Sequence, residues 1–240
     1  MTSSICIVAT GARTPLGLAA APSAAAVRAG ITALGDHPFM VDQVGDPMPG
    51  ALDAEINPRI MGPERFLLLA ETALSEACAP LQSVRANELT LPVFLGLPEI
   101  RPGFTEQDAL TIQSGISRFK GLPKPLAEVQ VFPKGHASGF LALAEAVEQL
   151  KTGALEACLV GGVESYFHPD TMEWLDANRQ LAGAISRSGF VPGEGSGFCL
   201  LMTEGGMVRL GLKPLARVVS VAVDTMPLRI VSSNLSIGTA

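Results

Sequence analysis

The sequence predicts a layered α/β fold with a mixed, mostly parallel sheet flanked by helices. Short apolar runs rich in β-favouring residues, such as residues 4–9 and 91–97, alternate with segments whose apolar residues recur at helical spacing, such as residues 64–79. Residues 197–202 (GFCLLM) are apolar without interruption, which is typical of a strand covered on both faces. Strands that alternate with helices indicate a largely parallel sheet with helices packed against it.

The composition is that of a globular chain, and we expect residues 1–240 to form a single domain. The 240 residues are 48% hydrophobic and include 25 glycines and 18 prolines, which suits many short apolar elements joined by tight turns. The 17 basic and 23 acidic residues give a net charge of −6. Because no block of basic residues could follow a phosphate backbone, nucleic acid is not an expected partner.

The first third of the chain is predicted to contain a strand, two helices and a long irregular segment. The first strand leads into a loop that contains Pro15 and Gly17, and an alanine-rich helix follows at about residues 23–29. Residues 37–63 are rich in proline, glycine and aspartate, which predicts an irregular surface excursion. The helical periodicity of residues 64–79 begins directly after it.

The central segment is predicted to hold a long helix between two strands. A tight turn brings His136 to the start of an apolar helix, and Gly153 ends that helix before a buried strand at residues 157–160 and the pair Gly161 and Gly162. The apolar residues of this helix lie on more than one face, so we expect it to be buried between layers.

Four further elements complete the prediction. Residues 103–121 are moderately helical, and residues 128–132 (EVQVF) alternate as a strand does. Residues 172–181 are a helix candidate, and residues 214–223 (PLARVVSVAV) read as a last strand. Together with the runs named above, these elements give the alternating order of an α/β domain.

The four cysteines are predicted to be reduced and buried, because each lies in an apolar strand or helix and none has the close spacing of a metal or redox pair: Cys6, Cys78, Cys158 and Cys199. Free thiols favour the cytoplasm. No stretch of 18 apolar residues occurs, and no charged segment followed by an apolar run opens the chain. We therefore expect neither export nor membrane spanning.

Four segments, in order and at matching spacing, resemble the β-ketoacyl synthases and other condensing enzymes of the thiolase fold. They are IVATGARTPLG at residues 7–17 with VRAGI at 27–31, ERFLLLAETALSEA at 64–77, the interval from His136 to the Gly161 and Gly162 pair, and GFVPGEGSGFCLL at 189–201. The resemblance covers most of the chain. It implies a thiolase-like layered fold, of which this chain carries the N-terminal half and the start of the second.

The chain departs from the family pattern at three places. His136 occupies the position of the nucleophilic cysteine, and Ser188 occupies that of an acidic residue before the Gly-Phe pair. Family members continue into a second half with two active-site histidines, in HGT-type and NIGH-type motifs. We expect residues 213–240 to be the start of that half, so this chain alone lacks both histidines.

The resemblance implies acyl-transfer chemistry and the partners that such chemistry uses. It implies an acyl thioester substrate carried by an acyl carrier protein, in fatty acid or polyketide biosynthesis. It also implies a homodimer, or a heterodimer with a ketosynthase chain, and it implies neither a cofactor nor a metal.

His136 is the candidate catalytic residue, in a role that differs from that of a cysteine. A condensing enzyme uses a thiolate at a helix N-terminus to accept the acyl group as a thioester, and nearby backbone N–H groups stabilise the oxyanion. An acyl-imidazole is far more labile than a thioester, so a neutral His136 could act only as a base or a hydrogen-bond donor. The alternative is that His136 simply fills the former cysteine pocket.

We name Ser138, Phe190, Gly193 and Gly195 as candidate substrate-binding residues. Ser138 is fourth in GHASG, whereas a hydrolase elbow needs its serine third, so it reads better as a small residue that lets helix and sheet approach. The glycines at 193, 195 and 197 precede a strand and not a helix. We therefore expect a turn or bulge at a pocket mouth, and not a phosphate loop.

The remaining ionisable residues give weaker signals. Glu164 and Glu194 are expected to bind backbone donors beside glycine-rich turns, with a catalytic carboxylate pair as the alternative. His37 and His168 show no metal spacing with His136 and are expected in loops or at the surface.

Two readings of the function stay open, and a third fails. The chain is either an acyltransferase homologue of the β-ketoacyl synthases, inactive in condensation as it stands, or a non-catalytic partner that resembles chain-length-determining subunits. A nicotinamide-dependent reductase would need a glycine at Pro15 and a lysine four residues after Tyr166, where the chain has Asp170.

Overall fold

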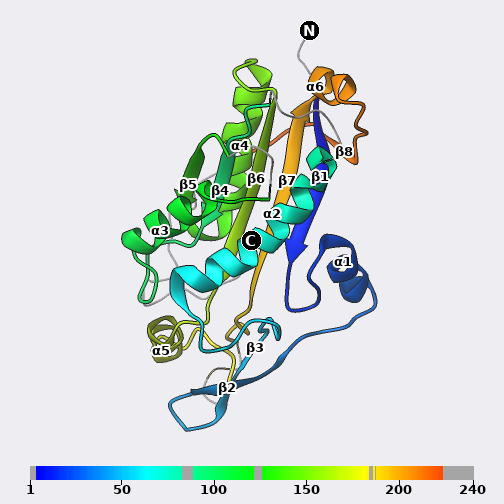
Figure 1. The fold of residues 1–240 in the computed structure, drawn as a ribbon. Helices are drawn as coiled ribbons and strands as arrows, with labels where there is room; N and C mark the ends of the chain where they lie inside the picture. The colour runs from blue at the N-terminus through cyan, green and yellow to red at the C-terminus, as the bar shows by residue number, and fades with distance from the viewer. Residues whose placement is uncertain (1–3, 83–88, 122–125, 184–185, 187, 224–240) are drawn as a thin grey trace.

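The computed structural model describes residues 4–82, 89–121, 126–183, 186 and 188–223 of the chain. Figure 1 shows a central sheet with helices on both faces and a small hairpin at one end. The elements in chain order are β1 Ile5–Arg13, α1 Ala20–Arg28, β2 Gly35–Val41, β3 Pro47–Gly50, α2 Gly62–Gln82, β4 Val93–Leu97, α3 Glu106–Ser117, β5 Val129–Pro133, the 3-10 turn η1 Gly135–Ala137, α4 Ser138–Lys151, β6 Ala157–Ser165, α5 Pro169–Ala177, β7 Glu194–Thr203, α6 Glu204–Arg209 and β8 Ala216–Val218.

The main sheet is mixed, and most of its strands share one direction. Its order is β5-β4-β6-β7-β1-β8, with β4 parallel to both β5 and β6. Strand β7 runs antiparallel to β6 and β1, and β8 runs antiparallel to β1. Strands β1, β4, β5 and β6 therefore point one way while β7 and β8 point the other, which confirms the predicted mixed, mostly parallel sheet between helices.

The two faces of the sheet are covered unequally. Helix α2 crosses one face over β6, β7 and β1, and α3 lies beside it over β5 (Figure 1). On α2 the buried residues recur at helical spacing, and Leu69, Ala73 and Leu74 are fully buried in the larger core. The opposite face has a smaller core built around Ala146 and Leu150 of α4.

Local signals in the sequence explain where several elements begin and end. The side chain of Thr105 starts α3 with a capping box to Asp108. His168 caps the first turn of α5, and Pro169 follows at the position where proline suits a helix. Gly153 follows the C-cap residue of α4, Thr152, and adopts a φ of 77°, a conformation that glycine adopts without strain.

The segment predicted as irregular is ordered. Residues 37–63 contain most of a two-stranded sheet, β2 paired with β3, which packs with α5 through the apolar residues Met40, Met48, Phe167, Met172, Leu175 and Leu181. The prediction was wrong because proline and glycine in this hairpin occupy strand positions, and its apolar residues are too widely spaced to form an alternating pattern. His37 is consequently 3% exposed in β2, and not in a loop or at the surface as predicted.

The prediction that α4 is buried between layers is also wrong for this structure. One side of the helix packs on the sheet, but Phe140 is 64% exposed. A second layer could cover that side only if it came from outside the described residues.

Three element boundaries differ from the predictions. Helix α5 starts at Pro169, three positions before the predicted residue 172, because the His168 cap precedes the apolar pattern. Strand β7 already begins at Glu194, and β8 covers only Ala216–Val218 of the predicted strand at 214–223. Of residues 213–240, predicted as the start of a second half, 224–240 lie outside the described residues. Within the described part, no helix is both long and apolar enough to cross a membrane.

Candidate functional site

The segment from Pro133 to Ser138, which we call the elbow, joins β5 to α4. Gly135 adopts a φ of 68°, which turns the chain sharply, and Ser138 Oγ donates a hydrogen bond to the Gly135 carbonyl at 2.5 Å. His136 lies in the 3-10 turn before the helix, and its side chain is exposed. The prediction that His136 starts the long helix therefore needs a small correction, because α4 itself begins at Ser138. An exposed ring also does not fill a pocket, so that alternative is not supported.

Glycines bring the elbow close to the neighbouring strands. A Cβ on Gly96 of β4 would lie 2.8 Å from the Gly139 nitrogen and 3.0 Å from Ser138 Oγ. Real Cβ atoms do not approach backbone so closely, so α4 can rest on β4 only where residue 96 has no side chain. Ser138 is 7% exposed at this contact, which agrees with its predicted role as a small residue between helix and sheet.

The glycine pair of β6 serves close packing as well. A Cβ on Gly161 would lie 2.2 Å from the Gly197 carbonyl oxygen and 2.3 Å from the Phe198 ring of β7. One on Gly162 would lie 3.3 Å from the Gly96 carbonyl oxygen. Gly161 therefore lets β7 lay an aromatic ring across β6, on the face of the sheet that α2 covers.

The described cysteines are free, and three of them are poor nucleophiles. Cys6, Cys78 and Cys158 are buried, and Cys199 is half-buried. Burial raises the pKa of the Cys78 and Cys158 thiols to about 12 and also raises the pKa of Cys199. Because the thiolate is the reactive form, these three thiols are unreactive at neutral pH.

A second group of side chains lies where β4 and β6 end. Arg101, in the loop after β4, binds Glu164 of β6 at 2.6 Å and the Ser165 carbonyl oxygen at 3.0 Å. Its guanidinium also lies over the Tyr166 ring, 4.5 Å from the ring centroid. Burial, with Glu164 nearby, raises the pKa of Tyr166, while Arg101 opposes that shift. Glu164 thus binds an arginine, and not the backbone donors that we predicted for it.

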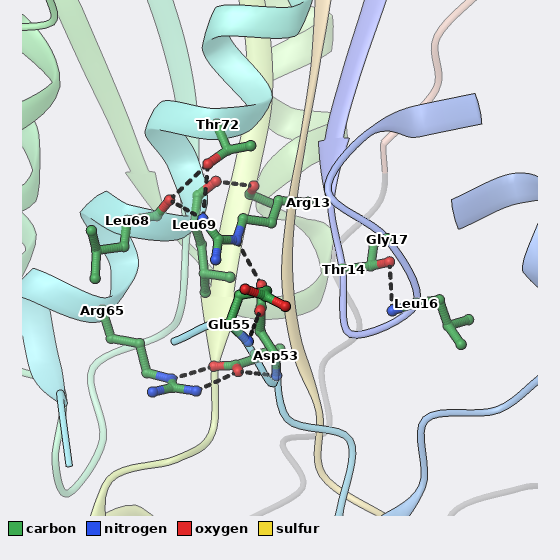
Figure 2. A network of polar contacts seen from close by, with 12 residues as sticks. Arg13, Thr14, Leu16, Gly17, Asp53, Glu55, Arg65, Leu68, Leu69 and Thr72 are labelled. Carbon is green, nitrogen blue, oxygen red and sulfur yellow. Dashed lines mark hydrogen bonds and ion pairs between the residues drawn. The ribbon is translucent and has the colours of Figure 1, made fainter. Parts of the chain in front are cut away.

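Glu194 lies at the centre of a buried polar network, and its partners Arg65 and Asp53 are labelled in Figure 2. Its two carboxylate oxygens accept from Nε and Nη2 of Arg65 at 2.5 and 2.6 Å, and both side chains are at most 1% exposed. The carboxylate also accepts from the Asp53 backbone N–H at 2.8 Å and from Ser165 Oγ at 2.9 Å. The predicted bond to a backbone donor is confirmed, whereas its arginine partner was not foreseen.

The Glu194 network extends to the start of the chain. Arg13, at the end of β1, binds Asp53 Oδ2 at 2.6 Å and Thr72 Oγ1 at 2.9 Å. Asp53 Oδ1 accepts from the Glu55 backbone N–H at 2.9 Å. Strands β1, β6 and β7 and helix α2 are thereby joined to the segment after β3. Ser165 also connects this network to the Arg101 and Glu164 pair.

The glycine-rich segment at 193–197 is extended, and not the turn or bulge that we predicted. Glu194 pairs with Ser165 and Gly197 with Gly162 in one continuous β6–β7 register. Gly195 lies against β1, since a Cβ there would be 3.1 Å from the Arg13 carbonyl oxygen. The alternating small residues were mistaken for turn signals because their reason is close strand packing, which only a neighbouring chain segment reveals.

The other candidate residues lie near the end of the sheet at which β6 ends and β7 begins. Gly193 bridges to Ala51, and its carbonyl oxygen accepts from the Tyr166 backbone N–H at 3.4 Å. Phe190 is 38% exposed and contacts the Tyr166 ring edge-on, with centroids 5.2 Å apart. The substrate-binding roles of Ser138, Phe190, Gly193 and Gly195, and the catalytic role of His136, stay predictions.

The three histidines do not come together as a metal site. His168 caps α5, and His37 is buried in β2. Among the described residues, no group of three histidine, cysteine, aspartate or glutamate side chains could hold a metal ion.

One signal in the sequence could have revealed the network in advance. Arg65 lies on the same helical face as the core residues Leu69 and Ala73, at spacings of four. A charged residue at a core position requires a buried partner, and Glu194, between two glycines before an apolar strand, was the candidate.

Residues 135–205, which include most of the elbow, the glycine pair and Glu194, match the family model described as "Beta-ketoacyl synthase, N-terminal domain". The predicted resemblance to β-ketoacyl synthases is confirmed. No curated protein matches the chain.

Solved structures of ketosynthases share the fold. A type II polyketide synthase acyl-carrier protein in complex with its ketosynthase matches with a TM-score of 0.71 at 15% identity, over 90% of this chain and 62% of that one. The ishigamide ketosynthase/chain length factor matches with a TM-score of 0.69 at 15% identity, over 91% and 63%. The ketosynthase from module 6 of the Bacillus subtilis 168 bacillaene synthase matches with a TM-score of 0.66 at 18% identity, over 90% and 43%. This chain thus spans less than two thirds of each of these structures. At such identities, the likeness establishes the ketosynthase fold.

Proposed function

We propose that this chain is a ketosynthase-fold subunit that does not condense acyl groups itself and acts as a non-catalytic partner of an active ketosynthase. The observation that carries the proposal is His136 at the elbow, where β-ketoacyl synthases have their cysteine. The thiols of Cys78, Cys158 and Cys199 have raised pKa values and do not supply another nucleophile.

Two further features support a partner chain. Strand β5 is the edge strand of the sheet next to the elbow, and an edge strand offers backbone groups for pairing. Phe140, one helical turn beyond His136, is a large apolar side chain that is 64% exposed, so a partner packed on α4 would gain from burying it. A ketosynthase chain packed at this edge would cover both, as the resemblance implies, and the acyl thioester would be delivered by an acyl carrier protein. The free cysteines are consistent with the cytoplasm.

A second candidate, residual acyl transfer by this chain, is favoured by the intact geometry of the elbow. Gly135 keeps its left-handed turn, and Ser138 holds the Gly135 carbonyl at 2.5 Å. His136 would then serve as a general base for water or another acceptor, a role worth about 10²–10⁴-fold in rate.

Thiol release from octanoyl-coenzyme A distinguishes the two candidates. If the chain is a non-catalytic partner, the wild type and the His136→Ala variant release thiol at the same background rate. If His136 is a base, the wild type is faster by about 10²-fold or more. The second result would overturn the partner proposal.

The His136→Cys variant tests whether the elbow still supports acylation. Intact-mass spectrometry after incubation with octanoyl-coenzyme A should detect one acyl group on this variant and none on the wild type or on His136→Ala. The two controls also exclude acylation of the native cysteines. Absence of the acyl group from the His136→Cys variant would count against a retained oxyanion site.

A further inference from the structure

His37 lies at an interruption of the β2–β3 ladder. The paired residues are Asp36 with Pro49 and then Val41 with Pro47, so residues 37–40 bulge out opposite Met48. A bulge leaves backbone N–H groups without ladder partners. In this bulge the side chain of His37 supplies the missing acceptor.

The hydrogen bonds of His37 require its neutral form. Nδ1 accepts from the backbone N–H of Met40 at 3.0 Å and faces that of Phe39 at 3.4 Å. A ring nitrogen that accepts carries no proton, so the proton of the neutral ring is on Nε2. Nε2 is buried and has no hydrogen-bond partner among the described residues. A second proton on the ring would place Nδ1–H against two N–H donors.

The surroundings of His37 also disfavour its charged form. The imidazole ring packs against the rings of Phe39 and Phe167, with centroids 4.7 and 5.6 Å apart. Neither phenylalanine side chain has an oxygen or nitrogen that could accept a hydrogen bond from a protonated imidazole. Burial is the main cause that lowers the pKa of His37, and Arg65 of α2 adds to it, while Glu194 of β7 opposes it. These two charged groups are already paired with each other.

We propose that His37 makes the β2–β3 hairpin a pH-sensitive element, closed while the imidazole is neutral and opened from Phe167 and α5 when it is protonated. Protonation removes the acceptor that holds the bulge and places a cation in an apolar contact. The open hairpin lets water reach the ring, which satisfies both N–H groups.

The opening would reach the candidate site through β3. The backbone N–H of Ala51, next to β3, donates to the Pro192 carbonyl at 2.9 Å, and that of Asp53 donates to Glu194. Figure 1 shows β2, β3 and α5 together at one end of the sheet. The hairpin is therefore joined to the start of β7, and its opening would loosen the segment that contains Gly193.

The direction of the pH effect follows from the lowered pKa. When the pH is above 6.5, the ordinary pKa of histidine, His37 is neutral in both the closed and the open hairpin. The equilibrium constant for opening therefore does not change with pH in that range. Below pH 6.5, the open form takes up a proton first, so the opening constant rises by up to about tenfold per pH unit. The rise stops once pH falls below the lowered pKa of the closed form.

Trp174 provides a local reporter for the test. It is the only tryptophan of the chain, and it packs against the cluster shared by the hairpin and α5. We expect its fluorescence to change between pH 7.5 and 5. Over the same range we expect a fall in the hydrogen-exchange protection factors of residues 37–50, which correct for the slower intrinsic exchange at low pH. The His37→Asn variant keeps an acceptor near the Nδ1 position but cannot titrate, so both signals should stay constant.

The other two histidines provide matched controls. His168→Asn keeps an acceptor for the Asp170 backbone N–H, and His136→Asn changes an exposed residue, so both variants should keep the wild-type transition. A transition that persists in His37→Asn, or that disappears in His168→Asn, would overturn the proposal. So would the absence of any transition in the wild type.

A second measurement keeps the proposal testable if His37→Asn does not fold. The double variant His136→Asn/His168→Asn retains His37 as its single histidine, so one imidazole signal can be followed by NMR. We expect the imidazole signal of His37 to titrate with a pKa below the ordinary histidine value of 6.5. Titration at or above 6.5 would contradict the closed, neutral state, whatever the function of the elbow.

Discussion

Two regions at the same edge of the sheet, the Glu194 network and the elbow, differ in how their polar groups are satisfied. Glu194 and Arg65 are buried, and both carboxylate oxygens have short bonds to the guanidinium. His136, at the position that matters for chemistry in the family, is exposed, and so is Phe140. The internal bonds therefore maintain the ketosynthase fold, while the predicted catalytic residue faces outward.

The difference shows that the contacts which hold the fold together do not depend on the side chain at the predicted catalytic position. The elbow is positioned by close packing on Gly96, by the turn at Gly135 and by the hydrogen bond from Ser138 to the Gly135 carbonyl, and none of these contacts involves the His136 side chain. A change of the side chain at residue 136 can therefore leave the fold intact.

The largest expected effect on stability is in the Glu194 network. Glu194→Gln keeps the shape of the side chain but leaves the Arg65 charge buried without a counter-ion, and we expect it to lower the free energy of unfolding by about 3–5 kcal/mol. Urea denaturation measures the loss. The matched control is Glu156→Gln, which breaks the exposed pair with Arg209 and should cost at most about 1 kcal/mol.

A loss from Glu194→Gln that is no larger than that of its control would remove the contrast between the two regions. The double variant Arg65→Met/Glu194→Leu refines the test, because replacement of a whole buried ion pair by apolar side chains is often close to neutral. We expect it to be more stable than Glu194→Gln.

A medium effect is expected where the elbow rests on β4. In Gly96→Ala the new methyl group meets backbone atoms of Ser138 and Gly139 at 2.9 and 2.8 Å, which cannot move without shifting α4. We expect a loss of about 1–3 kcal/mol in thermal or urea denaturation. The neighbouring variant Gly139→Ala meets no atom within 4 Å and should stabilise the helix by up to about 1 kcal/mol. Equal effects of the two variants would show that α4 does not rest on β4 as described.

The smallest effect on stability is expected at the exposed side chain of His136 in the elbow. His136→Ala removes an exposed side chain and should change the free energy of unfolding by no more than about 0.5 kcal/mol. The measurement is urea denaturation of this chain, with Leu150→Ala, a fully packed residue of α4, as the contrasting variant at about 2–5 kcal/mol. A loss at His136 as large as that at Leu150 would mean that the ring is covered in solution.

Much of the fold was predictable, because its signals are local. The spacing of apolar residues located α2, β4 and β6, and Gly153 marked the end of α4. Element ends were missed where a polar residue, such as His168, starts a helix before the apolar pattern does. The β2–β3 hairpin was missed because its bulge breaks the alternation that identifies a strand.

The candidate site was predictable only in part. The elbow and the glycine pair were found from sequence spacing, but the partners of Glu164 and Glu194 were not. Arg65 and Glu194 are separated by 129 residues, and Arg101 and Glu164 by 63, so no local pattern connects them. The exposure of Phe140 could not be foreseen either, because it depends on what covers α4.

By itself, the sequence determined the alternation of strands and helices, the sharp turn at the elbow and the resemblance to β-ketoacyl synthases, and from that resemblance it predicted that His136 occupies the position of the family cysteine. These depend on residue type and short-range periodicity, which the chain carries in any conformation. Only the tertiary structure decided that β7 runs antiparallel to its neighbours, that Glu194 binds Arg65 and that His37 is buried. Each of those depends on which distant segments meet, because burial and charge pairing are properties of contacts and not of the residues alone.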